Sequence, residues 1–209
     1  MTDKLSLYNG ALRLLGEERL ASTTEDVAPR HVLDDEWTDG IVDYCLEQGL
    51  WNFALRTSKL TYSSSVTPSF GYRYAFEKPS DWIRTAGIWS DDYLNSPVVL
   101  YRDEIGYLWC DLDTLYVQYI SNDTDYGLNY AGWPQTFVKY VEGQLAFNVC
   151  ERITQNKSKL EQVDGMRKRR LVDARSKDAL DQPAKFAPTG NWVAARGSGG
   201  FMRRGYDRG

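Results

Sequence analysis

The sequence predicts an α+β fold, in which a helical bundle contains an inserted, antiparallel β-rich domain and is followed by an extended C-terminal tail. Apolar residues recur at helical spacing near the amino terminus and again after Pro134, which predicts helices on both sides of the insertion. Between them, short aromatic and β-branched runs alternate with turn residues, which predicts strands. We therefore assign residues 1–50 and 133–181 to the bundle, 51–132 to the β-rich insertion and 182–209 to the tail.

Two amphipathic helices are expected before Leu50. The first ends at Gly16, because glycine readily adopts the left-handed conformation that closes a helix. The second is expected to begin at the capping-box sequence Ser-Thr-Thr-Glu of residues 22–25 and to run to about Gly49. Their apolar stripes indicate packing of helix on helix rather than a cofactor site. The stripes comprise Leu5, Tyr8, Ala11, Leu12 and Leu15 in the first helix and Leu33, Trp37, Ile41, Tyr44 and Cys45 in the second.

The segment from Trp51 to Tyr119 is typical of antiparallel β meanders, with a turn at Pro79 to Trp82. After a polar segment, Pro134 is well placed to open a helix, and a polar bridge at residues 154–158 separates it from the last helix. The expected strands are Ala54 to Tyr62, Tyr72 to Phe76, Arg84 to Trp89, Val98 to Tyr101, Gly106 to Cys110 and Leu115 to Ile120. The apolar positions of the two helices are Phe137, Tyr140, Val141, Leu145 and Val149, and then Leu160, Val163, Leu171 and Ala174 within Lys159 to Leu180.

Charge divides the chain into two unlike parts. Residues 1–151 hold 11 Lys and Arg against 23 Asp and Glu, a net charge of −12, whereas residues 152–209 hold 14 against 6, a net charge of +8; together they give the formal −4 of the chain. Such a chain can place its basic part on an acidic surface, including that of a neighbouring copy, as readily as on nucleic acid. Charge alone does not decide between an acidic protein surface and nucleic acid as the partner.

The tail after Asp181 contains prolines and glycines that remove any helical or strand period, which predicts an extended segment. Its spaced aromatic and basic residues favour binding along another protein, and a solvated terminus with chance aromatics is the alternative. The residues expected to bind the partner are Phe186, Trp192, Arg196, Phe201, Arg203, Arg204 and Tyr206.

Residue types that support catalysis or metal binding are sparse. The single histidine, His31, lies among polar neighbours on the expected second helix, and no Ser/His/Asp or Cys/His arrangement can be built without it. The pairs Asp111/Asp113 and Asp123/Asp125 fall in expected loops, but neither is followed by the rest of a calcium loop. We therefore expect that the protein is not an enzyme and has no cofactor or metal; a glycan hydrolase using those carboxylates is the weakest alternative.

The three cysteines are far apart in the chain, which predicts buried free thiols rather than disulfides or a zinc site. No run approaches the ~18 apolar residues of a membrane span, and the amino terminus lacks the features of a leader. We therefore expect no membrane partner and a protein assembled in a cytoplasm.

The sharpest basic cluster is the run Arg-Lys-Arg-Arg at residues 167–170. It favours an alternative function, nucleic-acid binding through the last helix and the tail, which salt-dependent binding to duplex DNA would distinguish. Asp164 and Asp173 in the same helix and the acidic remainder of the chain argue against this alternative.

Four motifs in the first part of the chain resemble the podovirus tail tubular protein A family, the head-to-tail adaptors. The first is Ala-Leu-Arg-Leu-Leu-Gly-Glu at residues 11–17, which is followed by Leu-Ala-Ser at 20–22 and Thr-Glu-Asp at 24–26. The chain departs from the family pattern at Leu50, where a proline is frequent, and at Trp82, where a smaller residue is common. The other motifs are Trp51-Asn52-Phe53-Ala54, Tyr74-Ala75-Phe76 and Pro79-Ser80-Asp81-Trp82.

The resemblance implies a helical bundle with an inserted β-rich domain, twelve copies of which form a ring beneath the portal protein. Genomic DNA would pass through the bore without sequence-specific binding. The C-terminal extension would dock on the portal, and the β-rich end would face the tail nozzle protein. The chain would then be a virion component of the head-tail interface, assembled in the host cytoplasm.

Overall fold

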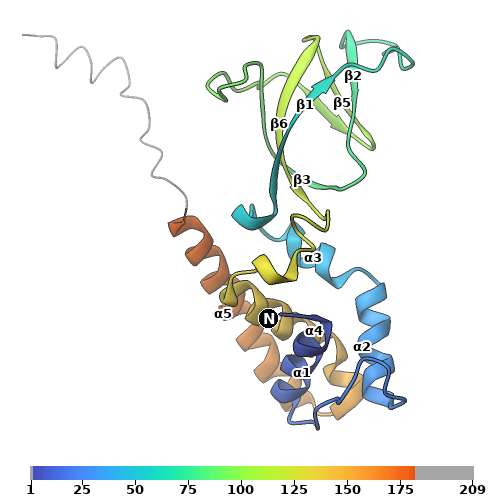
Figure 1. The fold of residues 1–209 in the computed structure, drawn as a ribbon, viewed down its shortest axis with the longest axis vertical. Coiled ribbons are helices and arrows are strands. Elements are labelled where there is room, and N and C mark those ends of the chain that lie inside the picture. Colours follow the sequence, from blue (N-terminus) through green and yellow to red (C-terminus); the bar gives the residue numbers. More distant parts are fainter. Residues whose placement is uncertain (1, 182–209) are drawn as a thin grey trace, which may run out of the picture.

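The computed structural model describes residues 2–181, whose helices and strands form two lobes of an α+β fold (Figure 1). The helical lobe contains the α-helices, which lie before and after the strands in the chain, and the β lobe contains two small antiparallel sheets. The fold class is therefore the one that the sequence predicts. The helices are α1 (Lys4–Leu15), α2 (Ala28–Thr38), α3 (Ile41–Glu47), α4 (Gln135–Thr154) and α5 (Lys157–Leu180).

The central element of the helical lobe is α4, because α1, α2, α3 and α5 all pack against it. Pro134 precedes its first turn, as expected. Helix α1 is capped at both ends: Asp3 and Ser6 exchange hydrogen bonds at its start, and Gly16 adopts a left-handed conformation (φ 85°) at its end. The predicted apolar residues of α4 are all buried, namely Phe137, Tyr140, Val141, Leu145 and Val149.

The last helix, α5, packs along α4 through the predicted thin stripe, of which Val163 and Ala174 are buried. It begins at Lys157, two residues before the expected Lys159, because the Asn156 side chain accepts a hydrogen bond from the Lys159 N–H at 3.1 Å and so caps the first turn. The expected polar bridge is correspondingly shorter.

The second helix differs from the expectation at both ends. The capping-box residues 22–25 do not start it, because the Glu25 carboxylate accepts the Ala21 N–H at 2.8 Å and closes a turn within the loop. The helix starts instead at Ala28. Nor does it run unbroken to Gly49, because Gly40 adopts a left-handed conformation (φ 85°) and separates α2 from α3.

The β lobe is antiparallel as expected, but it is not a simple meander. One sheet has the strand order β1-β6-β3 and the other β2-β5-β4, so the chain crosses between sheets and only β4 and β5 are both sheet neighbours and consecutive. Because the chain passes from one sheet to the other, the two sheets lie face to face and bury the apolar residues between them. The strands are β1 (Leu55–Thr61), β2 (Tyr74–Glu77), β3 (Trp82–Trp89), β4 (Arg102–Glu104), β5 (Tyr107–Cys110) and β6 (Thr114–Ser121).

The strand expected at Val98 to Tyr101 is wrong. The chain pairs with β5 only from Arg102 onwards, because Ile105 and Gly106 form a two-residue connection that aligns the residues immediately before it with Tyr107 and its successors. The turn expected at Pro79 to Trp82 is confirmed by the hydrogen bond from the Trp82 N–H to the Pro79 carbonyl.

Each lobe has its own apolar core. The larger core surrounds α4, and the smaller one lies between the two sheets, where Phe76, Leu108 and Leu115 are fully buried. Ile120, at the end of β6, belongs to the helical core, so the sheet is anchored in the other lobe. The cysteines are buried free thiols, as predicted, and over residues 2–181 no helix has the length and apolar character that a membrane crossing needs.

Candidate functional site

The residues that the sequence offered for chemistry lie apart from one another on the surface. His31 is exposed on α2, where its Nε2 lies 2.8 Å from Asp26 Oδ1. Asp111 accepts the Arg73 N–H at 3.0 Å and so joins two segments that are distant in the chain. Asp123 accepts the Asp125 N–H at 2.9 Å and closes a turn. Among residues 2–181, no three His, Cys, Asp or Glu side chains are grouped as metal ligands.

The expected partner-binding residues of the tail lie outside the described part of the chain, so the structure does not address them. They are Phe186, Trp192, Arg196, Phe201, Arg203, Arg204 and Tyr206. The candidate site within the described residues is therefore built from two other features, the joint between the lobes and the charged sides of the helical lobe.

The joint has an aromatic centre. Trp51, which follows α3, is only 1% exposed, and its indole N–H donates to the Cys45 carbonyl at 3.1 Å. Its ring meets Phe137 of α4 edge-on at 4.8 Å between centroids, and Phe53 lies at the same centroid distance from Phe137. The segment that leaves the helical lobe is thus fixed on α4 before it enters β1.

A carboxylate at the base of the β lobe completes the joint on one side. Asp81 accepts hydrogen bonds from Arg56 Nη1 at 2.9 Å, from the Tyr119 hydroxyl at 3.3 Å and from the Ser121 hydroxyl. Burial acts to raise the pKa of Asp81, but the bonds from Ser121 and Arg56 outweigh it and the pKa is lowered. Trp82 stacks on the Tyr119 ring at 4.2 Å. This network ties β1, β3 and β6 together where they meet the helices.

The end of α5 is tied to the same joint. Asp178 accepts the Asn52 N–H at 2.9 Å, and its carbonyl accepts the Asn52 side-chain amide at 2.8 Å. Burial raises the pKa of Asp178, against the lowering effect of the Asn52 N–H. Arg175 Nε donates to the Gln48 carbonyl at 2.9 Å, and Arg84 of β3 donates to the Glu47 carbonyl at 2.8 Å. The last helix, α3 and the β lobe are therefore held in one arrangement.

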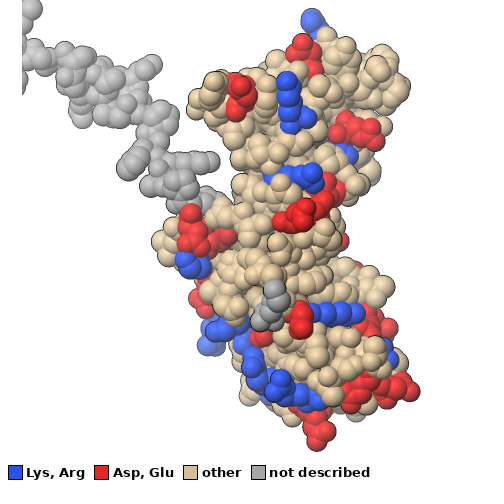
Figure 2. Space-filling view, viewed as in Figure 1, with Lys and Arg blue, Asp and Glu red and all other residues tan. Residues whose placement is uncertain are grey.

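The first charged side of the helical lobe is acidic and centres on α2. The segment 17–47 holds 10 Asp and Glu against 2 Lys and Arg, a net charge of −8. Figure 2 shows acidic side chains gathered on the part of the lobe where Figure 1 places α2. The exposed acidic residues from Glu17 to the C-cap of α2, which we call the acidic side, are Glu17, Glu18, Asp26, Asp35 and Asp39.

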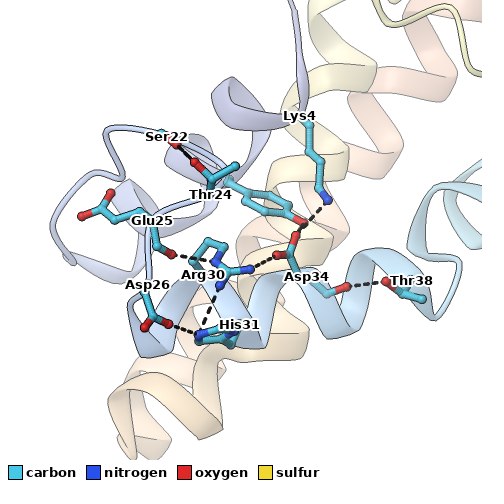
Figure 3. A network of polar contacts seen from close by, with 10 residues as sticks. Lys4, Ser22, Thr24, Glu25, Asp26, Arg30, His31, Asp34 and Thr38 are labelled. Atoms are coloured by element: carbon cyan, nitrogen blue, oxygen red, sulfur yellow. Dashed lines mark hydrogen bonds and ion pairs between the residues drawn. The ribbon is translucent and has the colours of Figure 1, made fainter.

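A partly buried carboxylate anchors α2 beneath this side (Figure 3). Asp34 accepts from the Tyr8 hydroxyl at 2.8 Å and from Arg30 Nη1 at 2.7 Å, and Lys4 Nζ lies 2.8 Å from the same carboxylate. Burial alone would raise the pKa of Asp34, but the bonds from Lys4, Tyr8 and Arg30 together lower it to about 2. The Arg30 Nε also donates to the Glu25 carbonyl at 2.7 Å, so one cation joins the loop to the helix.

The second charged side is basic and follows α5. From Lys157 to Leu180 the chain holds 8 Lys and Arg against 4 Asp and Glu, a net charge of +4. Figure 2 shows basic side chains along the flank where α5 lies, away from the acidic side. The exposed basic residues of α5, which we call the basic side, are Lys157, Lys168, Arg169, Arg175 and Lys177.

The four residues 167–170 do not form one basic stripe. This is expected, because consecutive residues of a helix point in different directions. Arg167 bonds to Asp164 and, at 3.0 Å, to Gln144 Oε1 of α4, and Arg170 donates to the Lys139 carbonyl at 2.7 Å. Only the two middle residues of the run, Lys168 and Arg169, are exposed. Half of the cluster therefore serves the packing of α5 on α4.

No pattern in the sequence indicated the joint. Its polar contacts join residues as far apart as Asn52 and Asp178, and no local pattern marks such a pair. The motif at residues 79–82 did contain Asp81, but nothing in it identified Arg56 and Ser121 as the partners. No protein-family model and no curated protein matches the chain.

Proposed function

We propose that this protein is a structural head-to-tail connector of a short-tailed bacteriophage. In this role twelve copies form a ring under the portal, join it to the tail nozzle and let the genome pass, and the chain acts without catalysis. The protein is then a component of the virion at the head-tail interface.

The observation that carries the proposal is the joint between the lobes. Two of the motifs that resemble the adaptors supply its central residues, since Trp51, Asn52 and Phe53 fix the exit from the helical lobe. Asp81 and Trp82 then brace the base of the sheets. The residues of the resemblance are thus used for architecture. A connector needs such a joint, because it must hold two different partners at a fixed relative position.

The surface of the β lobe also supports contact with another tail component. Several large apolar side chains in its loops are exposed to solvent, although isolated exposed residues of this kind are common in monomers. What favours a partner is that the five most exposed large apolar side chains of residues 2–181 all lie in this lobe. They are Phe70, Tyr93, Val99, Leu100 and Ile105.

The alternative function, nucleic-acid binding, is favoured by Lys168 and Arg169, which are exposed on α5. The basic tail would add a net +4 at residues 182–209, with 5 Lys and Arg against 1 Asp. Against it stand the acidic side of the same lobe and the internal use of Arg167 and Arg170. Binding to duplex DNA that weakens steeply with salt, together with no binding to the portal, would favour this alternative.

Electron microscopy of the full chain mixed with the portal protein of the same phage tests the proposal. We expect a ring of density beneath the portal. A chain truncated after Gln182 should keep its fold and lose most of its portal binding, because the seven predicted anchors are removed. The matched control is His31→Ala, which changes an exposed side chain and should assemble normally. Portal that stays bare at micromolar concentrations of the full chain would contradict the proposal.

A further inference from the structure

We propose that neighbouring copies of this chain contact one another head to tail, with the acidic side of one copy against the basic side of the next. The inference rests on the proposed ring for its biological setting, but its evidence is the charge distribution of the helical lobe. The partner of both surfaces is a second copy of the same chain.

The two sides lie on opposite flanks of one helix. Both α2 and α5 pack against α4, and Figure 1 shows them on either side of it. The segment of the acidic side has a net charge of −8 and α5 has +4, so each molecule presents opposite charges in opposite directions. Such surfaces are complementary to each other when copies are placed side by side in the same orientation.

This arrangement selects one kind of symmetry. A twofold dimer brings the same patch of both copies together, which would place acid on acid or base on base at these sides. A head-to-tail contact brings unlike patches together, and it repeats from copy to copy until rotation closes a ring. The charges therefore oppose a twofold contact at these sides and favour the contact from which rings are built.

Side chains on both sides are available for a partner. Arg169 on α5 and Asp39 at the end of α2 are exposed and have no ion-pair partner among residues 2–181. Lys168 is 67% exposed although it also meets Asp164, and Asp26 is 94% exposed beside His31. Val172, one turn from Arg169, is 63% exposed, so the basic side also offers an apolar contact.

The strength of the contact follows from the exposure of these groups. A single exposed ion pair contributes only about 0–1 kcal/mol, so several pairs must act together. Salt screens them, because the Debye length is about 10 Å at 0.1 M. Free copies should therefore associate weakly and in a salt-dependent manner, and a template such as the portal would favour ring closure by holding copies close together.

Charge reversal on one side at a time tests the contact in the full chain. The variant K168E/R169E loses the basic side and keeps the acidic one, and D26K/D39K does the reverse. A cation at residue 39 stands at the C-terminal end of α2, where the helix dipole favours it, so this variant should fold. The control, D92K/D113K, makes the same change of charge as D26K/D39K, but on exposed residues of the β lobe.

Sedimentation velocity at millimolar protein and about 20 mM salt is the measurement. Wild type and control should form species larger than dimers, and association should fall at about 0.5 M salt. Each side variant alone should associate at least about tenfold more weakly, because like charges then face each other. In an equimolar mixture of the two side variants, unlike charges face each other again at both kinds of contact, between the two unchanged sides and between the two reversed sides, so the mixture should regain association beyond the dimer.

Three results would overturn the inference: wild type that stays monomeric at low salt, side variants that associate as wild type does, or a mixture that behaves as its separate parts. Portal binding is measured separately, so the two proposals can fail independently. Charge-dependent association without portal binding would refute the connector and keep the contact. Portal rings that form equally well from both side variants would refute the contact and keep the connector.

Discussion

The two lobes are stabilised in different ways. The helical lobe surrounds α4 with buried residues from every other helix, and its core extends to Trp51 and Ile120 at the edge of the sheets. The β lobe has a much smaller core between short strands, and its loops expose Phe70, Val99 and other large apolar side chains. We infer that the helical lobe draws most of its stability from its own core, whereas the β lobe depends on the joint for part of its stability.

The largest effect is expected at the joint itself. Trp51→Ala removes a side chain that is nearly fully buried and that holds Phe53 and Phe137 in place. It should lower the free energy of unfolding by about 3–5 kcal/mol, because a large cavity replaces the ring. Hydrogen exchange should show loss of protection in both lobes. The control is Leu50→Ala, next to it and partly exposed. Loss of protection in the helical lobe alone would contradict the role of the joint.

A core substitution in the β lobe should destabilise that lobe and leave the helical lobe intact. Leu108→Ala empties a fully buried position and should cost about 2–5 kcal/mol. Because the helical core is separate, amides of the β strands should exchange faster while those of α4 stay protected. Ile105→Ala, at a fully exposed position in the connection between β4 and β5, serves as the control and should change little. Equal loss of protection in both lobes would show that they unfold as one unit.

The same contrast explains what could be predicted from the sequence. Long periodic helices with local caps were predicted well, because Gly16 and Pro134 act within a few residues of the elements that they close. The start of the second helix was predicted wrongly from the capping-box sequence at residues 22–25, because such side chains can make equally good hydrogen bonds within a loop. Gly40 was overlooked, since one glycine in a helical pattern does not by itself require a break.

Strands and the joint were harder to predict, because their partners are distant. Val98 to Tyr101 has strong β propensity, yet the connection at Ile105 decides which residues pair with β5. Asn52 and Asp178 are 126 positions apart, so no local signal links them. Overall charge asymmetry was readable from the sequence, but its placement on opposite flanks of α4 required the packing of the helices.

Acid should weaken the helical lobe through Asp34. Its pKa is lowered from 3.8 to about 2 in the folded protein, so its ionised form adds stability that is fully present above the ordinary pKa and is lost as the pH falls towards 2. The contribution is about 2 kcal/mol, at about 1.36 kcal/mol per pKa unit. Urea unfolding monitored in the helices at pH 5 and pH 2 measures it.

The control for this effect is Asp34→Asn, which cannot ionise. It should be less stable than wild type at pH 5, because Arg30 and Lys4 then lack a charged partner. At pH 2 the two proteins should approach each other, because part of the wild-type carboxylate is protonated. A difference in stability that stays constant between these pH values would show that Asp34 acts through packing rather than charge.

The smallest effects should come from one substitution made in each lobe. Gln155 (φ 48°), which closes α4, and Leu94 (φ 58°), in the loop after β3, adopt left-handed conformations that are unfavourable for residues with a Cβ. Glycine removes this strain but adds freedom to the unfolded chain, so each change should stabilise by only about 0.5–1 kcal/mol. If the lobes unfold separately, Gln155→Gly should shift only the helical transition and Leu94→Gly only that of the β lobe. Calorimetry that shows both variants raising one common transition would place the lobes in a single cooperative unit, and the joint would then couple them more strongly than their separate cores imply.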